Sequence, residues 1–210
     1  MNYRKFKIVI DFLFPTCRKL LVEASLRRFD FSCSEDVLII GAGSDPYRHM
    51  FSPSCRYITM DIAPIDGITQ VIADAHSLPV KNTAFDCILA SEVFEHLFNP
   101  VAFVNAAFDA LKPGGKLILT VPFMFHQHAD PHDYWRPTRQ ALIYYCANFS
   151  SCDVYAQGNR LHVISDLFTT AFYPWPIFYP FRILNHLFCL FNRVSGKSTA
   201  PTGFLVVVTK

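Results

Sequence analysis

The segment that most constrains this chain is an unbroken apolar run at residues 37–40, followed at once by Gly41 and Gly43. Such runs are typical of strands that are buried on both faces of a parallel sheet. Glycines directly after the strand let the chain turn sharply and let a ligand approach the backbone. Asp61, at the end of a second apolar run, is placed to accept hydrogen bonds from both hydroxyls of a ribose. These residues predict a fold that binds an adenosine-like cofactor.

Apolar runs alternate with helical or polar segments from about residue 36 to residue 121, which predicts a parallel sheet covered on both sides. Asn99-Pro100 should open a helix over residues 100–111, and residues 112–115 should close it. Thr138 is expected to cap a helix over 139–148, or to lie in its first turn. The expected strands are 37–40, 56–60, 69–72, 85–90, 116–121, 153–156 and 203–209.

The whole pattern predicts one α/β domain over residues 1–210, with a Rossmann-like, seven-stranded, mostly parallel sheet and helices on both faces. The last strand (204–209) is expected to run antiparallel. Within this domain we expect a basic helical flank at 1–34, a cofactor-binding half at 35–122 and an acceptor-side half at 123–210. The acceptor-side half carries a densely aromatic insertion at 168–191.

Composition excludes several classes of protein. With 51% hydrophobic and 17% charged residues, the chain is not disordered, and a net charge of +2 gives no reason to expect a nucleic-acid partner. The seven cysteines are scattered without a C-x-x-C pair, which argues against a disulfide framework or structural zinc site and favours a cytoplasmic location. Asp11 and Pro15 interrupt the N-terminal apolar run, so a cleaved signal peptide is not expected.

Five short segments follow one another in a fixed order: residues 40–47, Asp61, residues 73–79, residues 85–96 and residues 111–119. This series, which covers about residues 35–122, resembles the class I S-adenosylmethionine-dependent methyltransferases, in particular the methyltransferase type 11 group. The resemblance implies S-adenosyl-L-methionine as cofactor. The cofactor-binding residues that it implies are Gly41, Gly43, Asp61, Ile62, Asp74, Ala75 and Ser91.

Structural roles remain open for several of these residues. Asp61 can be a simple turn residue, and Asp74 can cap a helix that begins at Ala75. Glu92 and Glu95 can form the solvated face and first turn of a short helix.

A dinucleotide-binding enzyme is disfavoured by two residues of the first motif. Pro46 stands where the dinucleotide fingerprint needs its third glycine, and Asp45 places a negative charge where a pyrophosphate would lie. An S-adenosylmethionine site tolerates Asp45, whose carboxylate can pair with the ammonium of the cofactor. A nucleotide-dependent oxidoreductase or epimerase therefore remains only a secondary alternative, and a catalytically inactive S-adenosylmethionine-binding protein is another.

The segment 122–139, rich in His, Pro and aromatic residues, follows the fifth strand and should lie over the transferable methyl group. It is similar to a loop of type 11 methyltransferases from surface-polysaccharide and other glycan gene clusters. We therefore expect O-methylation of a small molecule or of a saccharide, a lipid-linked one included, with methylation of a nitrogen as the weaker alternative. The predicted catalytic residues are His128 and His132, which would take the acceptor's proton, and Asp133, which would orient an imidazole or take the proton itself. The predicted acceptor-binding residues are His126, Tyr134, Trp135 and Arg136.

Two other interpretations of this segment stay open. Its histidines at 126, 128 and 132, together with Asp130 and Asp133, offer metal-ligand chemistry, although no ligand pair on a helix is evident and no metal is expected. Alternatively, most of these residues only hold the loop in place.

The basic segment 1–30 and the aromatic segment 172–191 suggest peripheral contact with an acidic membrane surface. The prolines, with Arg182 and His186, argue against a membrane-spanning helix there. The alternative is that both segments cap the sheet and wall the acceptor pocket.

Overall fold

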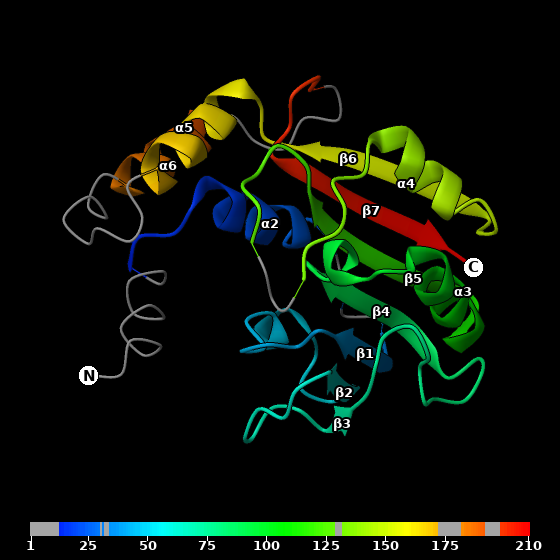
Figure 1. Cartoon of the computed structure of the whole chain (residues 1–210). Coiled ribbons are helices and arrows are strands. Elements are labelled where there is room, and N and C mark those ends of the chain that lie inside the picture. The colour runs from blue at the N-terminus through cyan, green and yellow to red at the C-terminus, as the bar shows by residue number, and fades with distance from the viewer. Residues whose placement is uncertain (1–12, 30, 32–33, 129–131, 172–181, 192–197) are drawn as a thin grey trace. The chain divides into compact units, whose positions relative to one another are not determined.

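The computed structural model describes residues 13–29, 31, 34–128, 132–171, 182–191 and 198–210, and it contains a seven-stranded sheet in the order β3-β2-β1-β4-β5-β7-β6 (Figure 1). This arrangement confirms the predicted fold class. The strands are β1 (Asp36–Ile40), β2 (Arg56–Asp61), β3 (Val71–Ile72), β4 (Phe85–Ser91), β5 (Leu111–Pro122), β6 (Ser151–Gln157) and β7 (Gly203–Thr209).

The centre of the sheet is parallel. β1 pairs in parallel with β2 on one side and with β4 on the other, β2 pairs in parallel with β3, and β4 with β5. Residues 37–40 of β1 and 87–90 of β4 are all buried, as expected for strands that are covered on both faces. The strand order reverses between β2 and β4, on either side of β1, which is the point where open α/β sheets bind ligands.

β7 runs antiparallel to its neighbours, as predicted. The N–H of Phe123, just after β5, donates to the carbonyl of Thr202, just before β7 (2.8 Å), whereas Lys210 N–H donates to Gly115 O (3.0 Å). The start of β7 therefore lies beside the end of β5. β6 shows the same relation to β7, since Thr202 N–H donates to Gln157 O (2.9 Å).

The helices begin where their capping residues predict. Asn99 and Thr138 accept hydrogen bonds from the N–H groups of Ala102 and Ala141, and so cap two of the helices. The α-helices are α2 (Cys17–Leu26), α3 (Pro100–Ala110), α4 (Arg139–Tyr145), α5 (Arg160–Thr170) and α6 (Ile183–Phe191), and the short 3-10 helices are η1 (Arg48–Met50) and η2 (Phe94–His96).

The clearest differences from the sequence-based expectation are in β5, β3 and α5. β5 begins at Leu111, directly after α3, because Leu111 already pairs with Phe85 of β4. The next pair is Cys87 with Lys116, so the register of the two strands shifts between these pairs. β3 is only two residues long. Helix α5 was not predicted, because four of its polar residues are buried and four of its apolar residues are exposed, the reverse of the usual pattern. The buried polar residues are His162, Ser165, Asp166 and Thr169, and the exposed apolar ones are Leu161, Ile164, Leu167 and Phe168.

The fold separates into two compact units. Unit 1 comprises Met1–Arg28, Pro122–His126 and Tyr155–Phe204, and unit 2 comprises Phe29–Val121, Gln127–Val154 and Leu205–Lys210. The single-domain organisation stays a prediction. All predicted cofactor-binding residues belong to unit 2.

Within unit 1, helices α2, α5 and α6 pack against one another around buried polar side chains. The Asp166 carboxylate accepts hydrogen bonds from the N–H groups of Cys17 (2.6 Å) and Arg18 (2.9 Å), so a residue of α5 satisfies the first amides of α2. Asn185 of α6 donates to Pro15 O (2.9 Å). In the described part of the chain, none of the helices has the length and apolar character needed to cross a bilayer.

Candidate active site

The bend after β1 is built from two glycines with left-handed backbone angles. Gly41 has φ +66° and Gly43 has φ +53°. A Cβ on Gly41 would overlap with Cγ2 of Val93, deep inside van der Waals contact. Position 41 therefore requires glycine for two independent reasons, its backbone angle and its close approach to the segment after β4.

Asp61, the last residue of β2, lies at this bend. Its Oδ2 accepts a hydrogen bond from Gly43 N–H (3.0 Å), and its Oδ1 accepts from Ala63 N–H (3.2 Å). A carboxylate has about four acceptor positions, so both oxygens retain capacity for the hydroxyls of a ribose. Ile62, the next residue, is 64% exposed and is therefore accessible to a nucleoside bound at this bend. The structure thus brings together three residues that the sequence predicted for the cofactor.

Asp74 follows β3 and is held by His76. Asp74 Oδ1 accepts from His76 N–H (2.9 Å) and lies 2.5 Å from Nδ1 of the same residue. Nε2 of His76 accepts from Asn99 N–H (3.2 Å), which leaves the imidazole proton on Nδ1, facing the carboxylate. Hydrogen bonds from His76, first its backbone and then its ring, hold the pKa of Asp74 below its usual value. No helix begins at Asp74, and Ala75 is buried.

A hydroxyl network occupies the end of β4. Ser91 Oγ lies 2.8 Å from Thr120 Oγ1 and donates to Tyr47 Oη (3.3 Å). Glu92 has a positive φ of +56°, and its N–H donates to Thr120 O (2.9 Å). A non-glycine residue in this conformation costs on the order of 1–3 kcal/mol, and such strain is concentrated at functional sites.

The described residues fit a nucleoside with a charged amino-acid tail. The bend of β1, the carboxylate of β2, the turn after β3 and the hydroxyls of β4 all lie at the carboxyl edge of adjacent parallel strands. Asp74 has a 54% exposed side chain, and Asp61 is half-buried. Their carboxylates are therefore accessible to hydroxyl and amine donors.

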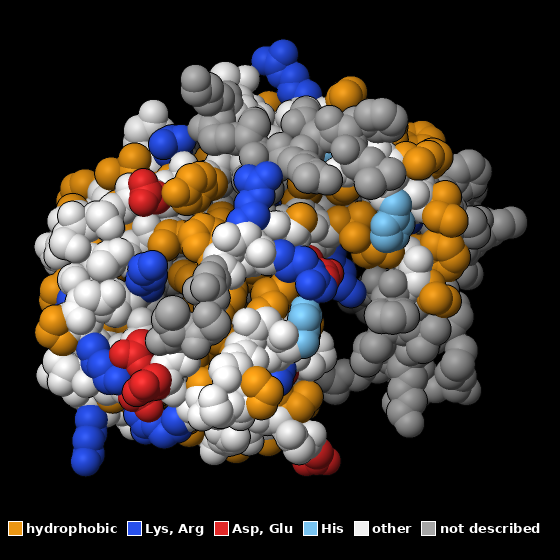
Figure 2. Space-filling view, turned by 180° about the vertical axis from the view of Figure 1, so that it is seen from behind, with side chains coloured by type: hydrophobic (Ala, Val, Ile, Leu, Met, Phe, Trp, Pro, Cys, Tyr) orange, Lys and Arg blue, Asp and Glu red, His pale blue; other side chains and the backbone are white. Residues whose placement is uncertain are grey.

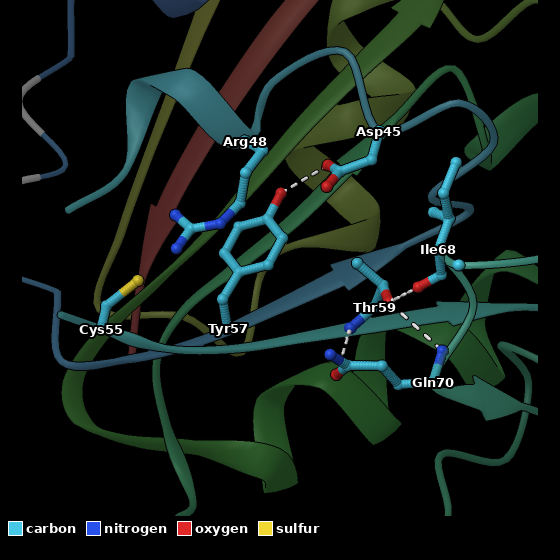
Figure 3. Close-up of a pocket in the computed structure, with 8 residues that line it drawn as sticks. Asp45, Arg48, Cys55, Tyr57, Thr59, Ile68 and Gln70 are labelled. Carbon is cyan, nitrogen blue, oxygen red and sulfur yellow. Dashed lines mark hydrogen bonds between the residues drawn. The ribbon is translucent and has the colours of Figure 1, made fainter. Parts of the chain in front are cut away.

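A separate open cavity of about 370 Å³ lies beside β2 (Figure 3). Tyr57 Oη donates to Asp45 Oδ1 (2.6 Å), and the Arg48 guanidinium lies 4.4 Å from the Tyr57 ring centroid. Asp45 thus has a partner inside unit 2, and its predicted pairing with the cofactor's ammonium stays a prediction. Apart from Asp45, no residue that was predicted to contact the cofactor lines this cavity, whose lining is Asp45, Arg48, Cys55, Tyr57, Thr59, Gly67, Ile68 and Gln70.

The acceptor segment is held against η2. Tyr134 N–H donates to Glu95 O (2.8 Å), and Trp135 Nε1 donates to Leu97 O (2.6 Å). His96 Nδ1 lies 2.5 Å from His132 O, and it must be the donor because a carbonyl only accepts. The rings of Tyr134 and Trp135 remain 47% and 38% exposed. Backbone and indole groups therefore fix the segment, while the aromatic faces stay available to a ligand.

His128 and Asp133 lie side by side, as their predicted roles require. Asp133 Oδ2 accepts from His128 N–H (2.9 Å) and lies 3.6 Å from His128 Nδ1. Arg136 holds both oxygens of Asp133, at 2.5 and 2.6 Å. Burial raises the pKa of Asp133, but the hydrogen bonds from Arg136 and His128 outweigh it and keep that pKa below its usual value. Because Asp133 engages the Arg136 guanidinium, acceptor binding by Arg136 stays a prediction.

Glu95 corrects one sequence-based interpretation. It was a candidate for the solvated face of a short helix, but its side chain is 0% exposed. η2 begins at Phe94 and turns Glu95 inward, toward His96 and His128. Burial raises the pKa of Glu95. The pair Glu95-His96, directly after a strand end, was the sequence signal that could have identified this cluster.

The remaining predicted residues are less informative. His132 is exposed, with its ring centroid 5.6 Å from that of Tyr134. His126 belongs to unit 1 and lies against Phe125, with ring centroids 4.2 Å apart. Asp130 lies outside the described residues, so the ligand set proposed from His126, His128, His132, Asp130 and Asp133 is not described as a whole.

A family model described as a methyltransferase domain matches residues 10–149, two thirds of the chain. The chain belongs to this methyltransferase family. It is a class I S-adenosylmethionine-dependent methyltransferase, and S-adenosylmethionine is its methyl donor. The resemblance inferred from the five ordered segments is thereby confirmed.

Individual relatives are distant. Malonyl-[acyl-carrier protein] O-methyltransferase of Hahella chejuensis is 28% identical over 100 residues, which cover 41% of this chain and 36% of that protein. A methyltransferase structure from Archaeoglobus fulgidus has a TM-score of 0.60 at 18% identity, covering 98% of this chain and all of that one. Phosphoethanolamine N-methyltransferase 2 of Haemonchus contortus, solved with S-adenosylhomocysteine, has a TM-score of 0.58 at 12% identity, covering 91% of this methyltransferase and 52% of that chain. These solved structures share the fold, and the acceptor is not determined by them.

Proposed function

We propose that this methyltransferase transfers the methyl group to a hydroxyl oxygen of a small molecule or a saccharide. The observation that carries the proposal is the position of His128, whose imidazole nitrogens lie 3.6 Å from a carboxylate oxygen of Asp133 and 3.6 Å from one of Glu95. Imidazoles oriented by carboxylates are typical proton acceptors, and a hydroxyl must lose its proton as it attacks the methyl group. The O-methyltransferase activity of the Hahella relative is consistent with this choice.

The proposed division of roles follows the strands and the acceptor segment. Gly41, Gly43, Asp61 and Ser91 would hold the cofactor, which supplies an electrophilic methyl group on sulfur when bound. The exposed rings of Tyr134 and Trp135 would stack on an apolar sugar face. Transfer then depends mainly on alignment of the hydroxyl with the methyl group. His128 and His132 are the proposed proton acceptors, with Asp133 orienting His128.

The first prediction concerns these two histidines. We expect His128→Gln and His132→Gln, made singly, to leave S-adenosylhomocysteine affinity unchanged and at least one of them to lower kcat about 100-fold or more. Incubation with methyl-labelled cofactor and fractionated extract would first identify an acceptor fraction. Full rates in both variants would contradict the assignment of the proton acceptor. Cofactor binding without labelling of any fraction would instead favour the catalytically inactive alternative.

We further propose that unit 1 contacts an anionic membrane surface. Unit 1 has 11 Lys and Arg residues and three Asp and Glu residues, which gives it a net charge of +8. Unit 2 has eight Lys and Arg residues and 14 Asp and Glu residues, which gives it a net charge of −6. The packed pair α5 and α6 also exposes large apolar side chains. They are Leu161, Ile164, Leu167 and Phe168 of α5 and Ile183, Leu184, Leu187 and Phe188 of α6. Figure 2 shows hydrophobic side chains on one face of the molecule, at the right of the view among others. Positive charge with an apolar helical face is typical of interfacial binding. Residues 1–12 and 172–181 of the sequence-predicted contact lie outside the described residues.

Flotation with vesicles tests this contact. We expect the protein to float with phosphatidylserine-containing vesicles and not with phosphatidylcholine alone, and to be released by about 0.5 M NaCl, which screens surface charge. Ile164→Glu, on the exposed face of α5, should abolish flotation. Ile143→Glu is the matched control, since Ile143 is an exposed isoleucine of α4 in unit 2. Equal behaviour of the two variants, or no flotation of the parent chain, would contradict the proposal.

A further inference from the structure

Three potential ligand atoms converge beside η2. Glu95 Oε1 lies 3.7 Å from His96 Nε2 and 3.6 Å from His128 Nε2, and the potential ligand atoms of the three residues all lie within 4.8 Å of one another. All three residues belong to unit 2. We infer that Glu95, His96 and His128 form a binding site for a divalent transition-metal cation.

The strongest support for a metal site is the burial of the Glu95 carboxylate. The side chain is 0% exposed, and neither carboxylate oxygen has a hydrogen-bond partner among the described residues. Burying an unpaired carboxylate is costly, so such groups are almost always paired or coordinate a metal. The two facing imidazole nitrogens lie within ion-pair distance of Glu95 Oε1, at 3.7 and 3.6 Å, so a protonated ring could also balance its charge. A cation between the three groups would satisfy the carboxylate.

The outer contacts of both histidines also match a metal site. Metal-binding histidines usually donate their second N–H to a carboxylate or a backbone carbonyl, which orients the ring and leaves the other nitrogen free to coordinate. His96 Nδ1 donates to His132 O, and His128 Nδ1 lies 3.6 Å from Asp133 Oδ2, which Arg136 holds in turn. With its proton on Nδ1, His96 turns its Nε2 lone pair toward Glu95, and a proton on Nδ1 of His128 would turn the Nε2 lone pair of that ring the same way.

The donor set and spacing select the class of ion. Ligand atoms around a tetrahedral zinc ion lie about 3.3 Å apart, close to the 3.6 and 3.7 Å found here. Two imidazoles and one carboxylate suit Zn²⁺, Fe²⁺, Co²⁺ or Ni²⁺ rather than Mg²⁺ or Ca²⁺, which prefer oxygen ligands. Three protein ligands leave a position open, as catalytic sites do.

The consequence for catalysis rests on the proposed O-methylation. A hydroxyl of the acceptor bound at the open position would have a lowered pKa and would lose its proton more easily. In the metal-bound protein His128 would act through the ion, which lowers the pKa of the hydroxyl, and His132 would receive the proton; in the metal-free protein His128 keeps the proposed role of proton acceptor. The cation would also join η2 to the acceptor segment, because it binds residues from both.

The test is to measure metal binding without cofactor or acceptor. Its result then does not depend on whether the protein transfers a methyl group to a hydroxyl. The full chain is freed of metal with a chelator and titrated with Zn²⁺ by calorimetry and with Co²⁺ by visible absorption. We expect a single ion per chain, with Co²⁺ bands typical of nitrogen and oxygen ligands. Glu95→Gln and His128→Gln should each weaken binding about 100-fold or more. His49→Gln, a change at an exposed histidine outside the cluster, should not weaken it.

Each other outcome overturns the inference. No binding by the parent chain would mean that a protonated imidazole alone pairs with Glu95. Thiolate-to-cobalt bands would place the ion on cysteines, and unchanged affinity in both variants would place it elsewhere. Because Glu95→Gln alters a buried group, its thermal unfolding and S-adenosylhomocysteine affinity are measured in parallel. His128→Gln, at a half-buried position, decides the question if Glu95→Gln fails to fold.

Discussion

Replacement of Asp61 by Ala is expected to weaken S-adenosylhomocysteine binding about 100-fold. The carboxylate would accept two hydrogen bonds from the ribose, and each bond to a charged group contributes about 1.5–3 kcal/mol. Loss of about 3 kcal/mol corresponds to a factor of about 100 in the dissociation constant. Calorimetric titration with S-adenosylhomocysteine measures this directly, and no methyl acceptor is needed.

The control must separate ligand binding from loop structure, because Asp61 also accepts from Gly43 N–H and Ala63 N–H. Asp61→Asn keeps an acceptor oxygen but loses the charge, so an intermediate affinity is expected. Asp66→Ala removes an exposed carboxylate from the loop that follows β2 and should leave affinity unchanged. An Asp61→Ala variant with the parent affinity and a normal melting temperature would exclude this residue from the cofactor site.

The sheet and its carboxyl edge were predictable because local signals and tertiary structure agree there. Residues 37–40 are apolar and become a fully buried strand, and the glycines that follow adopt the positive φ angles that glycine allows. Asn99 and Thr138 cap helices through contacts only three residues away. Such features depend on neighbouring residues, which a sequence displays directly.

The missed features depend on partners that are distant in the sequence. Helix α5 hides polar residues, because Asp166 satisfies the amides of α2, some 150 residues earlier in the chain. Its exposed apolar residues therefore give no useful periodicity. Glu95 lies where residues 132–135 are held to η2 and Leu97: Tyr134 N–H donates to Glu95 O, Trp135 Nε1 donates to Leu97 O, and the His96 side chain donates to His132 O. Neither partner can be identified from the local pattern around Asp166 or Glu95.

Gly41→Ala should impair both folding and cofactor binding. An alanine at φ +66° costs roughly 1–2 kcal/mol, and its methyl group would overlap with Cγ2 of Val93. Val93 has a stiff, β-branched side chain that cannot easily turn away. We expect a free energy of unfolding lower by about 2–4 kcal/mol, measured by urea denaturation, and a clear loss of S-adenosylhomocysteine affinity.

A double variant separates the two causes. Gly41→Ala with Val93→Ala removes the overlapping methyl group but keeps the unfavourable backbone angle. The double variant should therefore recover the steric part of the loss relative to Val93→Ala alone, and about 1–2 kcal/mol should remain. If the two substitutions lower the free energy of unfolding additively, the bend must move to avoid Val93 in the Gly41→Ala variant. Recovery of stability without recovery of affinity would instead show that an added Cβ at position 41 occupies space that the cofactor needs, which places the bound nucleoside directly against this bend.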